Sequence, residues 1–253
     1  MIREFHQISL RTRNSFGVDQ QAARLVEFET PEDLRTLFAA GIPEKWTVLA
    51  GGNNILFTRD YDGVLLTPVA RGITLLSDDG DEVRVRADAG VEWDDLVEWA
   101  VGRGLWGIEN LSLIPGKAGA APVQNIGAYG CEAKDAIRRA KLPDPAVLGN
   151  AGSFFKNPVV GAAAAERLLA EYPDMPHYPA PEGRVKLAAG WLIDRAGMKG
   201  RRKGAVGVHE RQALVLVNHG GATGGEVIAF AHEVQERVRE KFGIEIDTEV
   251  NIL

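Results

Sequence analysis

The stretch VEFETPEDLRTLFAAGIPEKWTVLAGGNN, residues Val26–Asn54, carries the pattern that decides the fold. Val26–Glu29 alternates like a short strand, and Thr30 followed by Pro31 is typical of a helix N-terminus with Thr30 as the N-cap. A glycine then ends the helix, and Thr47–Ala50 predicts a buried strand that runs into two further glycines. A strand, a helix and a second strand in this order predict a small βαβ-like unit.

Short strands and helices continue to alternate as far as the C-terminus. Strands are predicted at 55–57, 64–66, 82–87 and 213–217, and helices around 96–101 and at 162–172, 187–196 and 226–242. The helix around 96–101 is expected to bury a face that includes Val101. After Gly243 apolar and polar residues alternate, with Glu249 on the polar face. Together these patterns predict an α+β fold.

Composition and charge exclude several classes of protein. The chain has 253 residues, a formal net charge of −6 and no long basic run, which argues against nucleic acid as a partner. Its single cysteine, Cys131, excludes an intramolecular disulfide and a Cys-based zinc site, and the five histidines show no metal-ligand spacing. Because neither a signal peptide nor a membrane helix is visible, we expect a cytoplasmic protein with no metal and no membrane partner.

Three stretches rich in small residues are candidate ligand sites. Gly51-Gly52-Asn53-Asn54 could present converging N–H groups to an anion such as a pyrophosphate, although a structural turn is the commoner explanation. In Leu113–Gly130 small residues would let the backbone approach a flat or phosphorylated ligand, or they form a plain connector. In Gly149–Pro158 Ser153 lies between small residues and two aromatics, and a hydroxyl there could be a proton donor shielded from water, although most loop serines are structural.

Two charged features could serve a ligand or could simply be solvent-exposed. The densest basic cluster suits a small anionic ligand, but it is also compatible with a solvated loop; it consists of Lys199, Arg201, Arg202 and Lys203. Glu249, on the polar face of the last predicted strand, is solvated in most such positions and gains a role only if a site forms beside it.

Six motifs in a fixed order carry a resemblance to a known family. They are GGNN at 51–54, ENLSLIPG at 109–116, QNIGAYG at 124–130, KLPDP at 141–145, GNAGSFFKNP at 149–158 and KLAAGWLID at 186–194. In this order they resemble the UDP-N-acetylenolpyruvoylglucosamine reductase family, in its longer, proteobacterial-type form. The resemblance runs from about Asn14 to the C-terminus. It implies an α+β fold with a vanillyl-alcohol-oxidase/PCMH-type FAD-binding region and a C-terminal substrate-binding domain.

The resemblance also implies a domain plan and an activity. Residues 1–67 would form a first FAD-binding subdomain, 68–140 a second, shortened one completed by 243–253, and 141–242 the substrate-binding domain. The implied reaction is the FAD-dependent, NADPH-consuming reduction of UDP-N-acetylenolpyruvoylglucosamine to UDP-N-acetylmuramate, in the synthesis of peptidoglycan precursors. In that reaction NADPH gives hydride to FAD and its product leaves before the sugar nucleotide binds. We expect a monomer that acts on a small molecule.

Site residues follow from the resemblance position by position. Ser153 would protonate the neighbour of the carbon that receives hydride, and Glu249 would lie near the enolpyruvyl group. Lys141, Asn157 and Lys199 would hold the substrate's diphosphate and sugar. The residues expected to bind or line FAD are Gly51, Gly52, Asn53, Asn54, Pro115, Gly116, Gln124, Asn125, Gly127 and Tyr129.

The sequence departs from the family pattern in one place. Family members carry an extra stretch before the KLPDP motif, which completes much of the FAD-binding sheet and holds a Tyr-Arg pair whose Arg stabilises developing negative charge. Here only eleven residues separate Tyr129 from Lys141, and no Tyr-Arg dipeptide occurs. Two functions therefore stay open: an active reductase, and a non-catalytic or impaired relative that binds FAD or the UDP-sugar. A third, another FAD enzyme such as an oxidase, is disfavoured by the GNAGSFFKNP motif.

Overall fold

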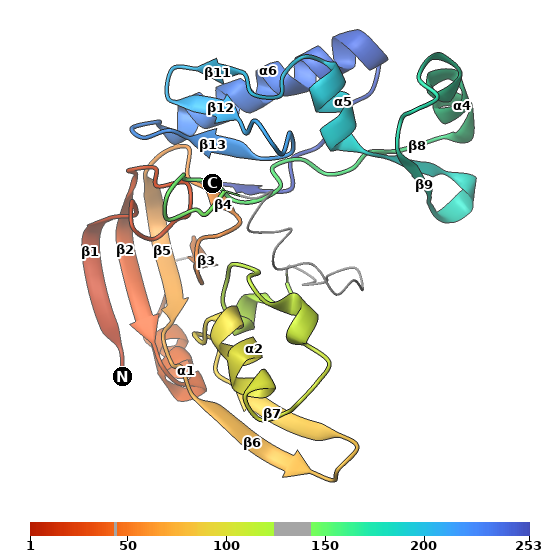
Figure 1. Ribbon diagram of the computed structural model, residues 1–253. Helices are drawn as coiled ribbons and strands as arrows, with labels where there is room; N and C mark the ends of the chain where they lie inside the picture. The colour runs from red at the N-terminus through yellow and green to blue at the C-terminus, as the bar shows by residue number, and fades with distance from the viewer. Residues whose placement is uncertain (43–44, 124–142) are drawn as a thin grey trace. The chain divides into compact units, whose positions relative to one another are not determined.

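The computed structural model describes residues 1–42, 45–123 and 143–253, which form two compact units (Figure 1). Unit 1 consists of the described residues of 1–13, 20–53 and 60–140, and unit 2 of those of 14–19, 54–59 and 141–253. Helices and strands are mixed in both units, which confirms the predicted α+β class. The division of the chain into two FAD-binding subdomains and a substrate-binding domain stays a prediction.

Unit 1 is built on a four-stranded mixed sheet with the strand order β1-β2-β5-β3. β1 is antiparallel to β2, whereas β2 and β3 both run parallel to β5. The elements of unit 1 are β1 (Arg3–Ser9), β2 (Gln21–Phe28), α1 (Pro31–Ala39), β3 (Trp46–Val48), β5 (Tyr61–Pro68), β6 (Ile73–Asp78), β7 (Val83–Ala87), α2 (Trp93–Val101) and the 3-10 turns η1 (Glu109–Leu111) and η2 (Ala118–Ala120). The predicted strand–helix–strand order of this region is therefore confirmed.

α1 begins and ends where its sequence predicts and covers one face of the sheet. The Thr30 hydroxyl accepts a hydrogen bond from Asp33 N at 3.0 Å, and the Asp33 carboxylate accepts one from Thr30 N at 3.0 Å, which completes a capping box. Leu37 of α1 packs against a buried cluster on the sheet that includes Val64 and Leu66 of β5. Because side chains alternate along a strand, residues 65 and 67 of β5 face the other side of the sheet.

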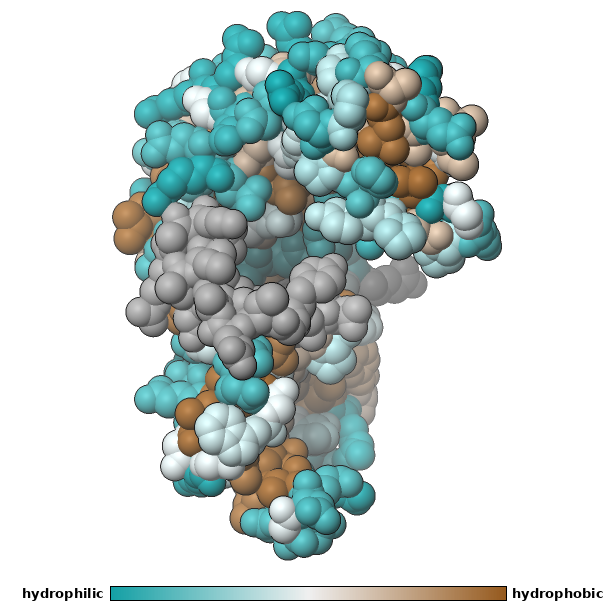
Figure 2. Space-filling view, turned by 45° about the vertical axis from the view of Figure 1, so that its right-hand side comes forward, coloured by the Kyte–Doolittle hydropathy of each residue, from teal (hydrophilic) through white to brown (hydrophobic). Residues whose placement is uncertain are grey.

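β6 and β7 form a separate two-stranded sheet among the described residues. Leu75 and Leu76 of β6 are each about half exposed, and Figure 2 shows apolar side chains at the lower end of the view, where this hairpin lies. In α2 the prediction of a buried face is correct for Val97 but wrong for Val101, which is 42% exposed because it lies at the last position of the helix.

Among the described residues, unit 2 contains two three-stranded sheets and the longest helix. The strand orders are β8-β10-β9 and β11-β12-β13, and β14 pairs in parallel with β4. The elements are β4 (Ile55–Leu56), β8 (Val159–Val160), α4 (Ala162–Glu171), β9 (His177–Pro179), η3 (Pro181–Gly183), β10 (Val185–Leu187), α5 (Ala189–Arg195), β11 (Arg202–Lys203), β12 (Val206–Val208), β13 (Leu216–Asn218), α6 (Gly224–Phe242) and β14 (Asn251–Ile252). The pairing of β14 with β4 joins the C-terminal strand to residues 54–59 of the same unit.

α6 is capped at both ends and buries the predicted apolar stripe. Thr223 and Glu226 form a capping box at its N-terminus, and Gly243 ends it in the left-handed conformation with φ +67°. The stripe packs inward, since Val227, Val234 and Val238 of α6 are fully buried. Among the described residues, no helix combines the length and the apolar character that crossing a membrane requires.

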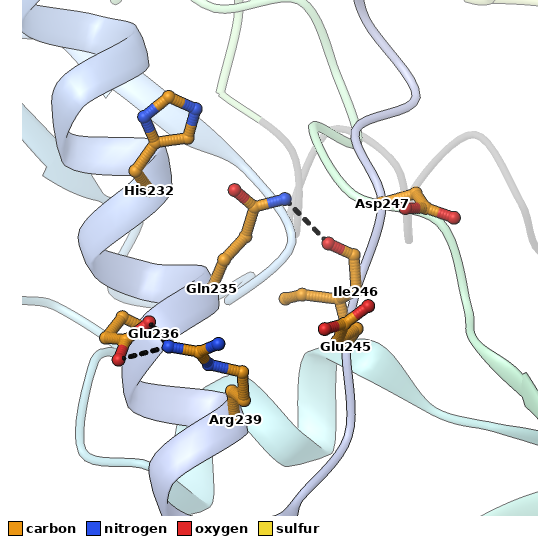
Figure 3. Close-up of a pocket in the computed structure, with 7 residues that line it drawn as sticks. All are labelled: His232, Gln235, Glu236, Arg239, Glu245, Ile246 and Asp247. Atoms are coloured by element: carbon orange, nitrogen blue, oxygen red, sulfur yellow. Dashed lines mark hydrogen bonds and ion pairs between the residues drawn. The ribbon is translucent and has the colours of Figure 1, made fainter.

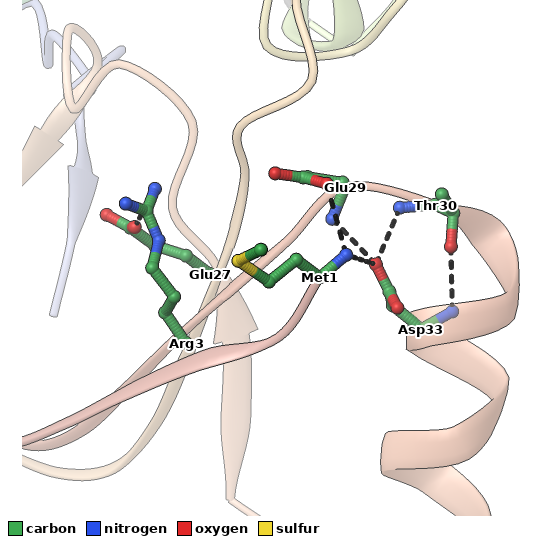
Figure 4. Close-up of polar contacts among 6 residues, drawn as sticks. All are labelled: Met1, Arg3, Glu27, Glu29, Thr30 and Asp33. Carbon is green, nitrogen blue, oxygen red and sulfur yellow. Dashed lines mark hydrogen bonds and ion pairs between the residues drawn. The ribbon is translucent and has the colours of Figure 1, made fainter.

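The start of α1 is also an ion-pair site (Figure 4). The amino group of Met1 lies 2.8 Å from Asp33 Oδ2 and 3.1 Å from Glu29 Oε2. The hydrogen bond from this ammonium group, followed by backbone N–H groups of Glu29 and Thr30, lowers the pKa of Asp33 from 3.8 to about 2. A carboxyl group whose pKa is depressed on folding stabilises the protein above its unfolded pKa, and this contribution is lost as the pH falls through the folded pKa.

We expect the melting temperature to fall between about pH 4 and pH 2 partly because Asp33 becomes protonated. Asp33→Asn should make this part of the pH profile shallower, since the titrating group is gone. Glu32→Gln, in the same helical turn and 75% exposed, is the matched control for the loss of one carboxylate. Melting curves from pH 2 to pH 7 test the prediction, and equal slopes in the Asp33→Asn variant and the parent chain would contradict it.

Candidate active site

A cavity of about 670 Å³ lies in unit 1, on the side of the sheet away from α1. Four basic and two acidic side chains line it, a surplus of two positive charges in a chain whose net charge is −6. Such a surplus favours an anionic ligand. The lining residues are Arg3, Thr12, Arg13, Glu27, Leu49, Ala50, Gly51, Asn53, Thr67, Pro68, Val69, Arg71, Gly90, Glu92 and Lys117.

An ion-pair cluster and a buried hydroxyl lie side by side in the wall of this cavity. Glu27, which is 6% exposed, accepts from Arg13 at 3.0 Å through Oε1 and from Arg3 at 2.8 Å through Oε2. Thr67 is the register partner of Glu27 on the neighbouring strand β5. Its hydroxyl is buried and has no hydrogen-bond partner among the described residues. This wall combines fixed positive charge with an unused polar group.

Two of the predicted FAD-binding segments lie next to each other at the cavity. A Cβ at Gly51 would lie 3.7 Å from Gly116 Cα, and Gly51 and Asn53 both line the cavity. Gly52 has φ +66°, a conformation that only glycine adopts without strain. The fourth residue of the motif, Asn54, belongs to unit 2, where its carbonyl accepts from Asn251 N at 3.2 Å and Asn251 Nδ2 at 3.0 Å.

Backbone hydrogen bonds to residues 91–93, at the start of α2, hold the Gly116 segment in place. Trp93 N donates to Gly116 O at 2.9 Å, and Ala118 N donates to the carbonyl of residue 91 at 2.8 Å. Lys117 forms an ion pair with Glu92 and its side chain is only 14% exposed. Gly116 is buried, whereas Pro115 is exposed, so within this loop the structure brings Gly116 and Lys117 to the cavity region.

In unit 2 the backbone brings the predicted catalytic residues to neighbouring segments. Lys156 N donates to Asp247 O and Glu249 N donates to Phe154 O, both at 2.8 Å, so residues 154–156 pair with 247–249 in antiparallel fashion. Ser153 is adjacent to this pairing. Both Ser153 and Glu249 are exposed. Ser153 therefore lacks the shielding from water that the sequence suggested, and Phe154 and Phe155 turn into the core, where they pack on each other at 5.1 Å between ring centroids.

The turn before Ser153 is fixed by a buried asparagine. Asn150 is 2% exposed, and its Nδ2 donates to Pro143 O at 3.1 Å and to Leu148 O at 2.8 Å. Its Oδ1 accepts from Gly152 N at 3.0 Å, and Gly152 has φ +67°. A side chain that uses both donor hydrogens and its carbonyl in one turn determines the direction in which the chain leaves toward Ser153.

The predicted substrate-binding residues of unit 2 already have protein partners. Asn157 Oδ1 accepts from Ala189 N at the start of α5 at 2.9 Å. Lys199 Nζ lies 2.7 Å from Asp194 Oδ2 and Lys203 Nζ lies 2.8 Å from Glu233 Oε2. The Lys203 ammonium holds the pKa of Glu233 below its usual value. These lysines belong to an exposed basic cluster that is partly balanced by carboxylates.

A second cavity, of about 330 Å³, lies in unit 2 between α6 and the segment that follows it (Figure 3). Gln235 Nε2 donates to Ile246 O at 2.7 Å, and Arg239 contacts both carboxylate oxygens of Glu236 at 2.7 Å. The first of these bonds ties the chain that leads to Glu249 onto α6. The lining residues are His232, Gln235, Glu236, Arg239, Glu245, Ile246 and Asp247.

Some predicted site residues lie outside the described residues, and others were missed. Gln124, Asn125, Gly127, Tyr129 and Lys141 belong to the first group. The cavity residues that the sequence did not predict are Arg3, Arg13, Glu27, Thr67 and Lys117. Alternation along 25–27 and 64–67 could have placed Glu27 and Thr67 on one face, but the parallel pairing of these strands, some forty residues apart, is not visible in the sequence.

Comparison with protein families assigns both parts of the chain. Residues 144–253 match the family model described as UDP-N-acetylenolpyruvoylglucosamine reductase, C-terminal domain, and residues 22–146 match one described as FAD binding domain. A solved structure of UDP-N-acetylenolpyruvylglucosamine reductase from Thermus caldophilus has a TM-score of 0.65 and 20% sequence identity, covering 100% of this chain and 98% of that one. At this identity the likeness supports the fold alone.

Curated relatives match along nearly the whole chain. UDP-N-acetylenolpyruvoylglucosamine reductase of Pseudomonas aeruginosa is 42% identical over 331 aligned residues, covering 96% of this chain and 97% of the relative. The enzyme of the same name from Chromobacterium violaceum is 41% identical, covering 97% and 98%. Because the first alignment spans 331 positions and this chain has 253 residues, at least 78 positions of that relative lie opposite a gap.

We expect Asn150→Ala to lower the free energy of unfolding by about 2–4 kcal/mol, because it leaves two carbonyls and the Gly152 N–H without their partner. Asn150→Asp should also destabilise at neutral pH and less at acidic pH, since a carboxylate would face two carbonyl oxygens. Urea unfolding measures both effects. Asn110→Ala is the control, because that amide makes a long 3.4 Å contact to Glu109; equal losses in Asn110→Ala and Asn150→Ala would contradict the assigned role.

Proposed function

The chain belongs to the UDP-N-acetylenolpyruvoylglucosamine reductase family, and from this premise we propose that it reduces UDP-N-acetylenolpyruvoylglucosamine to UDP-N-acetylmuramate with FAD as cofactor and NADPH as reductant. This reaction would supply a precursor of peptidoglycan. The observation that carries the proposal is the match of about 40% identity along nearly the whole chain to relatives of that name. The positively charged cavity of unit 1 and the paired segments of unit 2 provide physical support.

The residues of the unit 1 cavity fit FAD. Its surplus of positive charge suits a diphosphate, and the buried Thr67 hydroxyl has a hydrogen bond to give. A Cβ at Gly51 would meet the Asn53 side chain and lie 3.7 Å from Gly116 Cα, so glycine at position 51 permits this close approach beside the cavity. We assign Gly51, Gly52, Asn53 and Asn54 to the diphosphate, as the resemblance implies, and Pro115 and Gly116 to the flavin side, together with Gln124, Asn125, Gly127 and Tyr129 outside the described residues.

In unit 2 the proposed roles are proton donation and substrate binding. Ser153 would donate a proton to the carbon next to the one that receives hydride, with Glu249 on the paired segment near the enolpyruvyl group. When bound, FAD would carry the hydride from NADPH to the substrate. Lys199 and Asn157 would hold the diphosphate and sugar, with Lys141 outside the described residues. For Lys199 this means exchanging the carboxylate of Asp194 for a ligand phosphate.

We further propose that the protein works as a monomer in the cytoplasm on small molecules, without a nucleic acid or membrane partner. Its net charge of −6 disfavours binding to polyanions, and its basic side chains gather at the unit 1 cavity and in the exposed cluster around Lys199. Both locations have the size of a small anionic ligand rather than of a duplex.

The visible spectrum of the purified protein tests the proposed function directly. We expect a bound-flavin spectrum that bleaches with NADPH under nitrogen and recovers when the enolpyruvyl sugar nucleotide is added. The alternative outcome is flavin reduction without turnover. It would be explained by the missing internal stretch, because the resemblance implies that this stretch holds a fixed charge partner, and such a partner is commonly worth about 10²–10³ in rate. Flavin that bleaches but does not recover would identify a relative without turnover. A colourless protein that takes up no FAD would refute the proposal.

Ser153→Ala should separate the two half-reactions. Because the proposed proton donor acts only on the substrate, flavin reduction by NADPH should be unchanged, while reoxidation by the substrate slows by about 10²–10⁴-fold. Stopped-flow absorbance measures each step. Ser77→Ala, at an exposed position of β6, is the control and should leave both rates unchanged. A similar loss in both half-reactions for Ser153→Ala would rule out the assigned role.

A further inference from the structure

Thr67 occupies a place in the sheet where its side chain is not needed by the core. Val64 and Leu66 of β5 pack under α1, so the alternation of the strand directs Thr67 to the opposite face. Its register partner on β2 is Glu27, and both residues line the unit 1 cavity. The Thr67 side chain therefore belongs to the wall of a cavity rather than to the apolar core.

The burial of this hydroxyl is unfavourable unless a further group binds it. Thr67 is 7% exposed, and Oγ1 has no hydrogen-bond partner among the described residues. A buried hydroxyl without a partner destabilises the fold, whereas a methyl group of the same shape would not. The neighbouring carboxylate does not supply a partner, since Glu27 is held by both Arg3 and Arg13. A bound ligand is the natural source of the missing partner.

The charge of the surroundings identifies the chemistry of that ligand. Each guanidinium of the Arg3–Glu27–Arg13 cluster has five N–H donors, and the contacts to Glu27 use few of them. Arg71 and Lys117 add positive charge to the lining. A hydroxyl donor beside spare guanidinium donors suits an oxygen that accepts hydrogen bonds and carries negative charge, as a phosphate oxygen does.

We propose that the Thr67 hydroxyl binds a phosphate oxygen of the dinucleotide cofactor, with Arg13 beside it, and that it stays unsatisfied until the cofactor is bound. The identity of the cofactor as FAD rests on the proposed function. This arrangement has a distinctive consequence, because the same hydroxyl destabilises the cofactor-free protein and stabilises the complex. Removing it should therefore change the two properties in opposite directions, which a purely structural threonine would not do.

Thr67→Val tests this, because it replaces the hydroxyl by a methyl group and keeps the branched shape. In protein stripped of flavin, we expect its unfolding midpoint in urea to rise relative to the parent chain. Its dissociation constant for FAD should increase about 10- to 100-fold, as for the loss of a hydrogen bond to a charged group. Thr67→Ser should retain the affinity of the parent chain. Thr74→Val, at an exposed position of β6, is the control and should change neither property.

Riboflavin, which has no phosphate, identifies the atom that is contacted. Thr67→Val should change the affinity for riboflavin by less than about twofold, since the proposed partner is absent. An equal loss for riboflavin and FAD, or a lower unfolding midpoint of the stripped Thr67→Val protein, would overturn the proposal.

If the parent chain binds no FAD, the proposed function is overturned, but the phosphate contact can still be tested. Inorganic pyrophosphate is then the probe. Pyrophosphate should then raise the melting temperature of the parent chain more than that of Thr67→Val. The absence of a shift in the parent chain, or an equal shift in both proteins, would overturn the phosphate contact.

Discussion

Unit 2 depends on one pairing, in which the segment 154–156 hydrogen-bonds to the segment 247–249. Beyond the bonds at Lys156 and Glu249, Phe154 N donates to Leu214 O at 2.8 Å, so the motif segment is held from both sides. Its two phenylalanines fill the core beneath, and Ser153 is left at the exposed end of the pairing. Sequence segments some ninety residues apart thus acquire a fixed relation through backbone bonds, which tolerate side-chain change better than a side-chain contact would.

Unit 1 depends in the same way on backbone segments that pack directly against each other at glycines. A Cβ at Gly90 would lie 2.6 Å from Ala70 O, and one at Gly119 would lie 2.9 Å from Ala89 Cα, so no side chain fits at either place. This packing places the loop of Gly116 against the loop of Gly51 and leaves a cavity between charged walls. Some of the glycines are therefore required by the shape of this cavity and not only by turns.

Features that depend on neighbouring residues, such as helix caps and apolar stripes, could be predicted from the sequence. Features that depend on the pairing of distant strands could not. Thr30 and the stripe of α6 act within a few residues, and each has the predicted role. β1 was not predicted, because as an exposed edge strand it lacks a buried alternating face, and Arg3 was missed with it. Thr67 was missed because its importance arises from parallel register with Glu27, a relation that no local pattern encodes. Ser153 and Glu249 were predicted from the resemblance, and the backbone pairing that brings their segments together is visible only in the structure.

The stretch that the relatives carry and this chain lacks is internal. An alignment that reaches 96% of this chain and 97% of the Pseudomonas aeruginosa enzyme leaves little room for missing ends, so the 78 or more unmatched positions interrupt the alignment. The resemblance puts the interruption between Tyr129 and Lys141. The pairing that holds Gly116 lies before it and the pairing that positions Ser153 lies after it, each within one unit. The two backbone frameworks that present the proposed cofactor-binding and catalytic residues are therefore held by pairings before and after the interruption in the sequence.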